Sequence, residues 1–173
     1  CSPQGQPLGL QRQHYSDYLF NMHYFSDVSD ETMREKHFAY NDFCDAAQCF
    51  QHERKQRKKL RIGYISGELN QSVLSNFSIQ LLTGYDRSRY EVYCYNLQGN
   101  EDRLTASLKE YVACWRNFSN VSMMRQAAEQ IHADGIDILF DLNGHSSGGW
   151  TLMAAGYKPA PIQVSGIGYM STT

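Results

Sequence analysis

The chain alternates short apolar runs with amphipathic stretches over most of its length. Runs rich in β-branched and aromatic residues predict strands, and stretches in which apolar residues return every three or four positions predict helices. The predicted strands are residues 60–66, 90–95, 115–118, 136–142 and 162–168, and the predicted helices between them are 73–82, 102–112, 124–134 and 150–157. This alternation predicts a parallel sheet with helices on both faces, which is a Rossmann-like α/β fold.

Two further helices are predicted before residue 60. In the first, one apolar face is formed by Tyr15, Tyr18, Leu19 and Met22. The second begins at the cap Ser29 and is predicted to be long, with a face of Met33, His37, Tyr40, Cys44 and Ala47 and a solvated, basic end at 53–59. We therefore divide the chain into a helical segment, residues 1–59, and a Rossmann-like lobe, residues 60–173.

Composition narrows the class of protein. The chain has 173 residues and a formal net charge of -2, which is typical of a globular domain with a small appendage. It contains neither a run of roughly 18 apolar residues nor a signal-peptide pattern, so we predict a cytoplasmic location and no membrane partner. Five cysteines without CxxC spacing indicate neither a disulfide framework nor a zinc site. We expect reduced, mostly buried thiols and no metal.

The most informative stretch is residues 135–148, where an apolar run gives way to Asn143-Gly-His-Ser-Ser-Gly148. Ligands of open α/β sheets bind beyond the carboxyl ends of the strands, so His145 is the catalytic candidate and Asp141 is expected to cap the loop. No G-x-G-x-x-G, no phosphate loop and no G-x-S-x-G follows a predicted strand. These absences leave sugar-nucleotide chemistry open.

Six segments, taken together and in order, resemble one family. They are Leu60-Arg-Ile-Gly-Tyr-Ile-Ser66, Tyr90-Glu-Val-Tyr-Cys-Tyr95, Ile131-His-Ala-Asp-Gly-Ile-Asp-Ile-Leu139, Asp141-Leu-Asn-Gly-His145, Lys158-Pro-Ala-Pro-Ile-Gln163 and Gly166-Ile-Gly-Tyr169. They resemble the first half of the catalytic region of bacterial O-linked N-acetylglucosamine transferases of the SPINDLY type. The helices before residue 60 look like the family's link to tetratricopeptide repeats. We expect the chain to be a piece of a longer protein, with the lobe truncated at its C-terminal end.

The resemblance implies the first lobe of a GT-B glycosyltransferase. Such enzymes transfer N-acetylglucosamine from UDP-GlcNAc to Ser or Thr hydroxyls of proteins with inversion, and need neither a cofactor nor a metal. Most UDP contacts belong to a second lobe, so this lobe alone is expected to be inactive. Protein acceptors are expected to bind through the repeats, and no nucleic-acid partner is implied. Besides His145, the resemblance assigns to the donor cleft Ser72, Asn143, Gly144, Ser146, Pro159, Pro161 and Tyr169.

The chain departs from the family pattern at two places. Where the family usually has His-Pro-Val-Gly-Tyr-Phe, it reads Ser72-Val-Leu-Ser-Asn-Phe77, and Gly168-Tyr-Met-Ser-Thr-Thr173 replaces Gly-Tyr-Pro-Gly-Thr-Thr. Two alternatives therefore stay open: a non-enzymatic protein-binding adaptor built on a degenerate lobe, and a GT-B enzyme that uses another sugar. If the parent is an enzyme, the ring of His145 should be exposed to the cleft, near the loops that follow strands 60–66 and 162–168.

Overall fold

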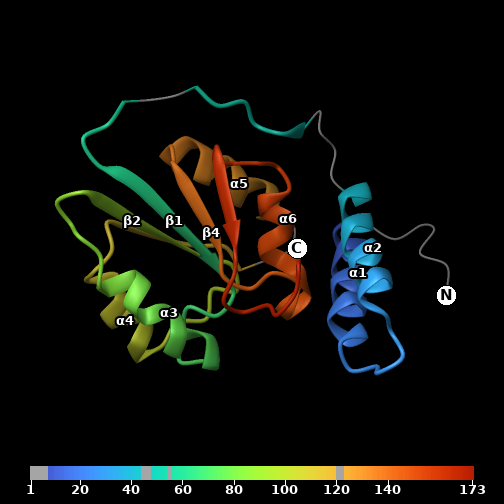
Figure 1. The fold of residues 1–173 in the computed structure, drawn as a ribbon. Helices are drawn as coiled ribbons and strands as arrows, with labels where there is room; N and C mark the ends of the chain where they lie inside the picture. Colours follow the sequence, from blue (N-terminus) through green and yellow to red (C-terminus); the bar gives the residue numbers. More distant parts are fainter. Residues whose placement is uncertain (1–7, 44–47, 54–55, 120–122) are drawn as a thin grey trace.

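The computed structural model describes residues 8–43, 48–53, 56–119 and 123–173. Its centre is a five-stranded sheet in the order β3-β2-β1-β4-β5, with every neighbouring pair parallel. The strands are β1 Leu60–Ser66, β2 Tyr90–Asn96, β3 Cys114–Asn117, β4 Ile138–Asp141 and β5 Ile162–Ser165. The prediction of a Rossmann-like parallel sheet is confirmed (Figure 1).

Helices connect the strands and form two cores, one on each face of the sheet. The helices α3 Val73–Thr83 and α4 Arg103–Lys109 follow β1 and β2, whereas α5 Met124–Asp134 and α6 Trp150–Ala155 follow β3 and β4. Because the chain reverses its direction across the sheet between β3 and β4, right-handed crossovers place the second pair on the opposite face.

The alternation of side chains along β1 and β2 shows these two cores. Ile62 and Val92 pack with Leu82 of α3 and Leu108 of α4. Ile65 and Tyr95 point the other way and pack with residues of α5 and α6 that include Ala127, Ile131, Met153 and Ala154. Successive strand residues face opposite sides of a sheet, so β1 and β2 are covered on both faces, whereas the residues of the edge strand β5 are exposed.

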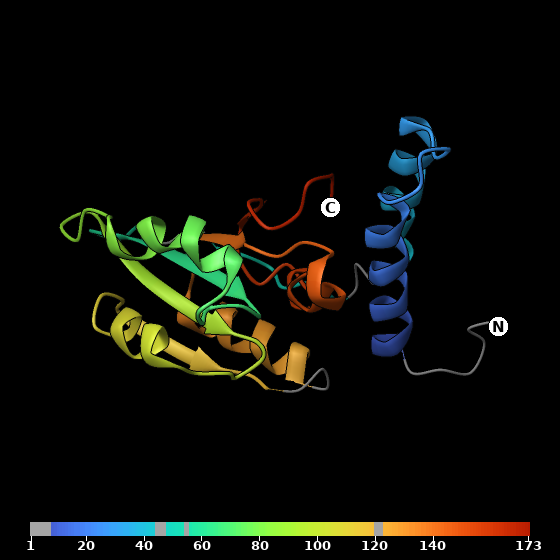
Figure 2. The same cartoon turned by 90° about the horizontal axis from the view of Figure 1, so that it is seen from below.

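The helical segment stands beside the lobe, next to α6, in both views (Figure 2). It consists of α1 Leu8–Met22, α2 Asp30–Phe38 and the 3₁₀ helix η1 Ala39–Phe43. Ser29 caps α2 by accepting a hydrogen bond from the amide of Thr32, as predicted. Arg12 anchors α1 by donating a hydrogen bond to the carbonyl of Phe43.

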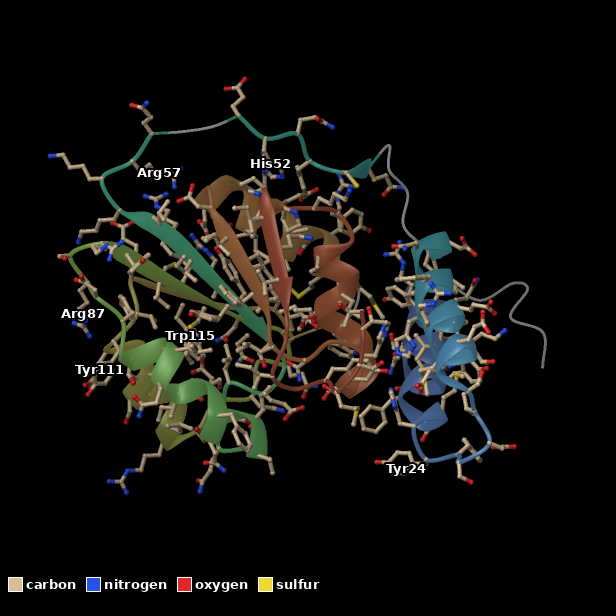
Figure 3. The ribbon with its side chains drawn as sticks, in the orientation of Figure 1. Tyr24, His52, Arg57, Arg87, Tyr111 and Trp115 are labelled. Carbon is tan, nitrogen blue, oxygen red and sulfur yellow. The ribbon has the colours of Figure 1, made fainter. Side chains whose placement is uncertain are left out.

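The prediction that the second helix runs into the basic residues 53–59 is wrong. The α-helix ends at Phe38, and residues 51–53 and 56–57 are not helical, while 44–47, 54 and 55 lie outside the described residues. The described residues 48–53 and 56–59 lie along the amino edge of the sheet, before β1 (Figure 3). Hydrogen bonds from Phe50 N to Tyr157 O and between His52 Nε2 and Lys158 O hold the first of these stretches.

Smaller differences concern boundaries and thiols. The strands predicted at 136–142 and 162–168 are four residues long each. The prediction of mostly buried thiols is right for Cys94 and wrong for Cys49 and Cys114, which are half-buried. Cys1 and Cys44 lie outside the described residues.

Gly135 ends α5 in a left-handed conformation, with φ 62° and ψ 50°, as glycine commonly does after a helix. Gly135→Ala should destabilise the chain by about 1–2 kcal/mol, because an L side chain is disfavoured at this φ. Gly166→Ala is the matched control, since no atom lies within 4 Å of an added Cβ there and its φ is not left-handed. Thermal unfolding should show a lower midpoint for Gly135→Ala alone. Equal midpoints for the two variants would contradict the left-handed cap.

Candidate active site

The loops that follow β1 and β4 meet at the carboxyl edge of the sheet. The side-chain carbonyl of Asn143 accepts hydrogen bonds from Ser66 Oγ at 2.6 Å and from the backbone amide of Gly67 at 3.1 Å. Asn143 itself is 2% exposed, so these bonds lie in the interior. The loop after β5 joins them through Tyr169, whose ring lies 5.2 Å from that of His145. The predicted meeting of three loops at one edge is confirmed.

Asp141 sets the path of the β4 loop. Its Oδ1 accepts hydrogen bonds from the amides of Asn143 and Gly144, both at 3.0 Å, and its Oδ2 accepts one from Ser165 Oγ at 2.7 Å. The carboxylate therefore caps the loop and ties β4 to β5, as expected. Gly144 has φ 60°, and a Cβ there would lie 2.6 Å from Cβ of Tyr169, so this turn requires glycine.

His145 is fully buried, with 0% of its surface exposed. The prediction of a ring exposed to a cleft is wrong. Its Nδ1 lies 3.0 Å from Ser16 Oγ of α1, its Nε2 has no hydrogen-bond partner among the described residues, and the ring of Tyr40 packs edge-on at 4.8 Å. The helical segment covers this loop, a contact that the sequence pattern could not reveal because it joins residues far apart in the chain. His145→Ala should therefore cost stability as well as any function.

Two more histidines and Tyr169 form a hydrogen-bonded chain beside this ring. His37 Nδ1 lies 2.7 Å from the carbonyl of Met33, an acceptor, so Nδ1 carries a proton. In neutral His37, Nε2 then accepts the proton of the Tyr169 hydroxyl, at 2.7 Å. The oxygen of Tyr169 in turn accepts from His23 Nε2, at 3.1 Å. Tyr169, predicted to line the donor cleft, is buried and fastens the helical segment to the loop after β5.

The predicted serines are engaged in local structure. Ser72 is the N-cap of α3 in a capping box with Ser75: its Oγ accepts from the amide of Ser75 and donates to the carbonyl of Glu68, both at 3.2 Å. Ser146 Oγ donates to the carbonyl of Asn143 at 2.7 Å. Both residues lie at the carboxyl edge, but their hydroxyls stabilise the loops that carry them.

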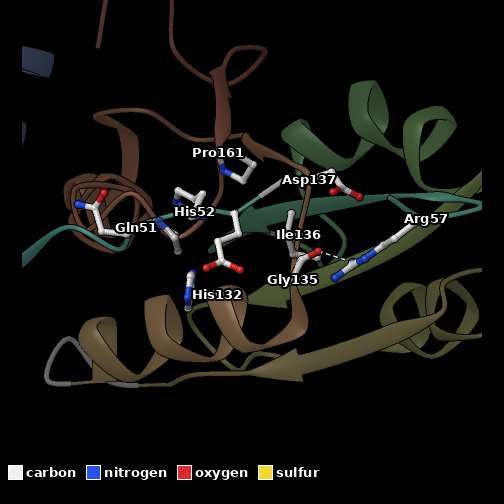
Figure 4. A pocket seen from close by; sticks show the side chains of 10 residues that line it. Gln51, His52, Arg57, His132, Gly135, Ile136, Asp137 and Pro161 are labelled. Atoms are coloured by element: carbon white, nitrogen blue, oxygen red, sulfur yellow. Dashed lines mark hydrogen bonds between the residues drawn. The ribbon is translucent and has the colours of Figure 1, made fainter. Parts of the chain in front are cut away.

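Pro159 and Pro161 do not lie at this edge. They precede β5 and line a cavity of about 310 Å³ at the amino edge, together with His52, Arg57 and His132 (Figure 4). The prediction that one cleft contains both prolines and His145 is therefore wrong in its geometry. A strand separates residues before it from residues after it, so the two groups line opposite edges.

Sequence reasoning missed Glu68, the acidic residue two positions after β1. Its Oε1 accepts hydrogen bonds from Ser147 Oγ at 2.7 Å and from Asn143 Nδ2 at 3.2 Å. Ser147 adopts φ 53°, which is unusual for a residue other than glycine. The position of Glu68 just after the predicted strand 60–66 could have identified it, because ligands of open α/β sheets bind beyond the carboxyl ends of the strands. The same argument selected His145.

Within the described part of the chain, no three His, Cys, Asp or Glu side chains gather in a way that could hold a metal ion. No helix there is both long and apolar enough to cross a membrane.

The fold is a single Rossmann-like lobe of the kind found in GT-B glycosyltransferases. The chain belongs to glycosyltransferase family 41, whose profile matches residues 42–173. It is 36% identical over 117 residues to the UDP-N-acetylglucosamine--peptide N-acetylglucosaminyltransferase of Caenorhabditis elegans, covering 67% of this chain and 10% of that protein. It is 26% identical over 163 residues to the probable enzyme SPINDLY of Petunia hybrida, covering 90% of this chain and 17% of that one.

A solved structure agrees with this assignment. A mutant of the Thermobaculum terrenum O-GlcNAc transferase superposes with a TM-score of 0.79 at 27% identity, over 91% of this chain and 31% of that chain. The present chain thus spans less than a third of the structural relative and less than a fifth of the two curated ones. The predicted SPINDLY-type resemblance is confirmed.

The buried histidines predict that stability falls with acid. Burial, and next the neighbouring His37 and His23, lower the pKa of His145 from 6.5 to about 3, and burial foremost lowers the pKa of His37. Between these pKa values the unfolded chain binds more protons than the folded one, so the free energy of unfolding decreases as pH falls below 6.5. For His145 alone the loss at pH ~5 is on the order of 2 kcal/mol.

Thermal unfolding at a series of pH values down to about pH 5 tests this, since carboxyl groups of low pKa titrate mostly below that range. His145→Asn keeps a polar partner for Ser16 but does not titrate, so its midpoint should depend less on pH. A parent midpoint that is constant over this range, or an unchanged slope in the variant, would contradict neutral buried histidines.

Proposed function

We propose that the full-length protein transfers N-acetylglucosamine from UDP-GlcNAc to Ser or Thr hydroxyls of proteins, with inversion at the sugar carbon. The observation that carries the proposal is the hydrogen-bonded carboxyl edge around Asn143, in a lobe with the fold of an O-GlcNAc transferase. The two curated relatives are named as UDP-N-acetylglucosamine--peptide N-acetylglucosaminyltransferases, which supports the same donor and acceptor.

The chemistry of the edge suits one side of such a reaction. In an inverting displacement the acceptor oxygen attacks the anomeric carbon while the bond to UDP breaks, so the acceptor must be held in line and the diphosphate charge must be stabilised. The side chains that bond to one another around Asn143 are Ser66, Glu68, Ser146 and Ser147, which are neutral or acidic. They suit the hydroxyl-bearing reactants. We assign the diphosphate to the second lobe, and we expect neither a metal nor a cofactor.

The same proposal covers partners and location. Protein acceptors would bind through tetratricopeptide repeats before the helical segment, and the enzyme would work in the cytoplasm without a nucleic-acid or membrane partner. In this arrangement Asn143, Gly144, Ser146 and Ser72 shape the cleft wall, while His145 and Tyr169 support it from behind the loop.

One observation favours the alternative of a non-enzymatic adaptor. The hydroxyl of Ser72, which replaces the usual histidine, is bonded within the cap of α3, and the unpaired Nε2 of His145 is buried where a reactant does not reach it. An adaptor would bind acceptor proteins without transferring sugar, and an enzyme for another sugar would prefer a different UDP donor.

Incubation of the full-length protein with radiolabelled UDP-GlcNAc and candidate acceptor proteins distinguishes these functions. We expect label on Ser or Thr, with UDP-GlcNAc preferred over other UDP-sugars. Acceptor binding without transfer would support the adaptor, and a preference for another donor would replace the sugar in our proposal.

The 173-residue chain by itself provides a second test. It should neither transfer sugar nor bind UDP tightly, because we assign most of the donor contacts to the missing lobe. Calorimetry with UDP measures this directly. A micromolar affinity for UDP would show that this lobe holds the nucleotide, contrary to the division of labour proposed above.

A further inference from the structure

Three polar side chains near the carboxyl edge are already engaged in holding the fold. Asp141 accepts bonds from two backbone amides and one hydroxyl, Ser72 caps α3, and His145 is sealed under α1. A group that contacts a reactant must come from elsewhere on the same loops.

Glu68 has the geometry that these residues lack. It is half-buried on the loop after β1, and the two hydrogen bonds that it accepts from described residues, from Ser147 Oγ and Asn143 Nδ2, go to the same oxygen, Oε1. No donor in the described ranges is bonded to Oε2. One oxygen is therefore fixed by the loop after β4, and the other remains free to accept a hydrogen bond.

The donors that hold Glu68 are themselves fixed. Asn143 is buried, and its Oδ1 is occupied by Ser66 and Gly67, which determines that its Nδ2 faces Glu68. Ser147 reaches the carboxylate from a left-handed conformation, φ 53° and ψ 37°, which costs free energy for a serine. Strained residues that persist in a fold are often found at functional sites, and here the strained residue aims its hydroxyl at this carboxylate.

We propose that Glu68 binds a hydroxyl group of a reactant in the cleft, through a hydrogen bond that its Oε2 accepts. This inference rests on the proposed transferase function. A carboxylate only accepts hydrogen bonds and repels phosphate, so it selects a neutral hydroxyl rather than the UDP diphosphate. The hydroxyl belongs either to the Ser or Thr acceptor or to the sugar, and kinetics separate the two.

Glu68→Gln tests the binding role without dismantling the loop. Ser147 Oγ and Asn143 Nδ2 both donate toward Oε1, so the amide of glutamine should place its carbonyl oxygen there. Its NH₂ group then occupies the position of Oε2, where a donor replaces an acceptor. The internal hydrogen bonds are kept, and the bond to the reactant is lost.

In the full-length protein, Glu68→Gln should lower kcat/KM about tenfold or more, with the thermal midpoint nearly unchanged. A loss in kcat/KM for the acceptor, with slow hydrolysis of UDP-GlcNAc preserved, assigns the bond to the acceptor hydroxyl. A loss in both transfer and hydrolysis, with a raised KM for UDP-GlcNAc, assigns it to the sugar. The matched control is Glu129→Gln on the exposed surface of α5, which should behave as the parent.

Ser147→Gly gives a second, independent measurement. Glycine suits the left-handed backbone, so the change removes one hydroxyl that holds Glu68 without adding strain. Transfer should fall by a smaller factor, about threefold to tenfold, because the carboxylate is less well fixed. If the parent transfers sugar and both variants match it, the role of Glu68 is refuted while the proposed function stands. A parent that transfers no sugar refutes the proposed function itself.

Discussion

The buried amide of Asn143 is the interaction on which the functional edge depends. Its side-chain oxygen accepts hydrogen bonds from Ser66, at the end of β1, and from Gly67 in the loop that follows. Its side-chain nitrogen donates hydrogen bonds to Glu68 and Ser146. An asparagine suits this position because it offers an acceptor and two donors from one planar group, whereas aspartate could only accept. Asp141, two residues before Asn143, accepts a hydrogen bond from the backbone amide of Asn143. The short loop after β4 therefore orders the ends of both β4 and β1.

The helical segment completes this edge rather than merely preceding it. Ser16 is hydrogen-bonded to His145 in the loop after β4, and His23 and His37 are hydrogen-bonded to Tyr169 in the loop after β5. The helical segment thereby covers both loops. The buried imidazole of His37 has partners from both parts of the chain, Met33 of the helical segment and Tyr169 of the lobe. The contacts of Ser16, His23 and His37 therefore cross the boundary at residue 60.

The periodic parts of the sequence were sufficient to predict most of the fold. The alternating run at β1 and the apolar face of α5 each follow from local pattern. The second helix was predicted too long because apolar spacing continued to Ala47, whereas the described residues 48–53 and 56–59 are not α-helical and lie along the amino edge before β1. The path of these residues depends on where β1 begins in three dimensions, and a short window of sequence does not contain that information.

The site was harder to predict than the fold for the same reason. The order of the strands could place Asn143, Gly144 and Ser72 at one edge, because parallel strands deliver their loops together. Whether His145 points into a cleft or under α1 depends on Ser16, more than a hundred residues away. Glu68 was overlooked because a single glutamate in a polar turn has a common solvated role, and only its bonds to Asn143 and Ser147 distinguish it.

A structure of the full-length protein with a UDP-GlcNAc analogue and an acceptor peptide would show directly where the reactants bind. We expect both ligands at the carboxyl edge, with Glu68 Oε2 within hydrogen-bonding distance of a hydroxyl and the diphosphate on the second lobe. Ligands in the cavity at the amino edge, beside His52 and His132, would contradict this expectation.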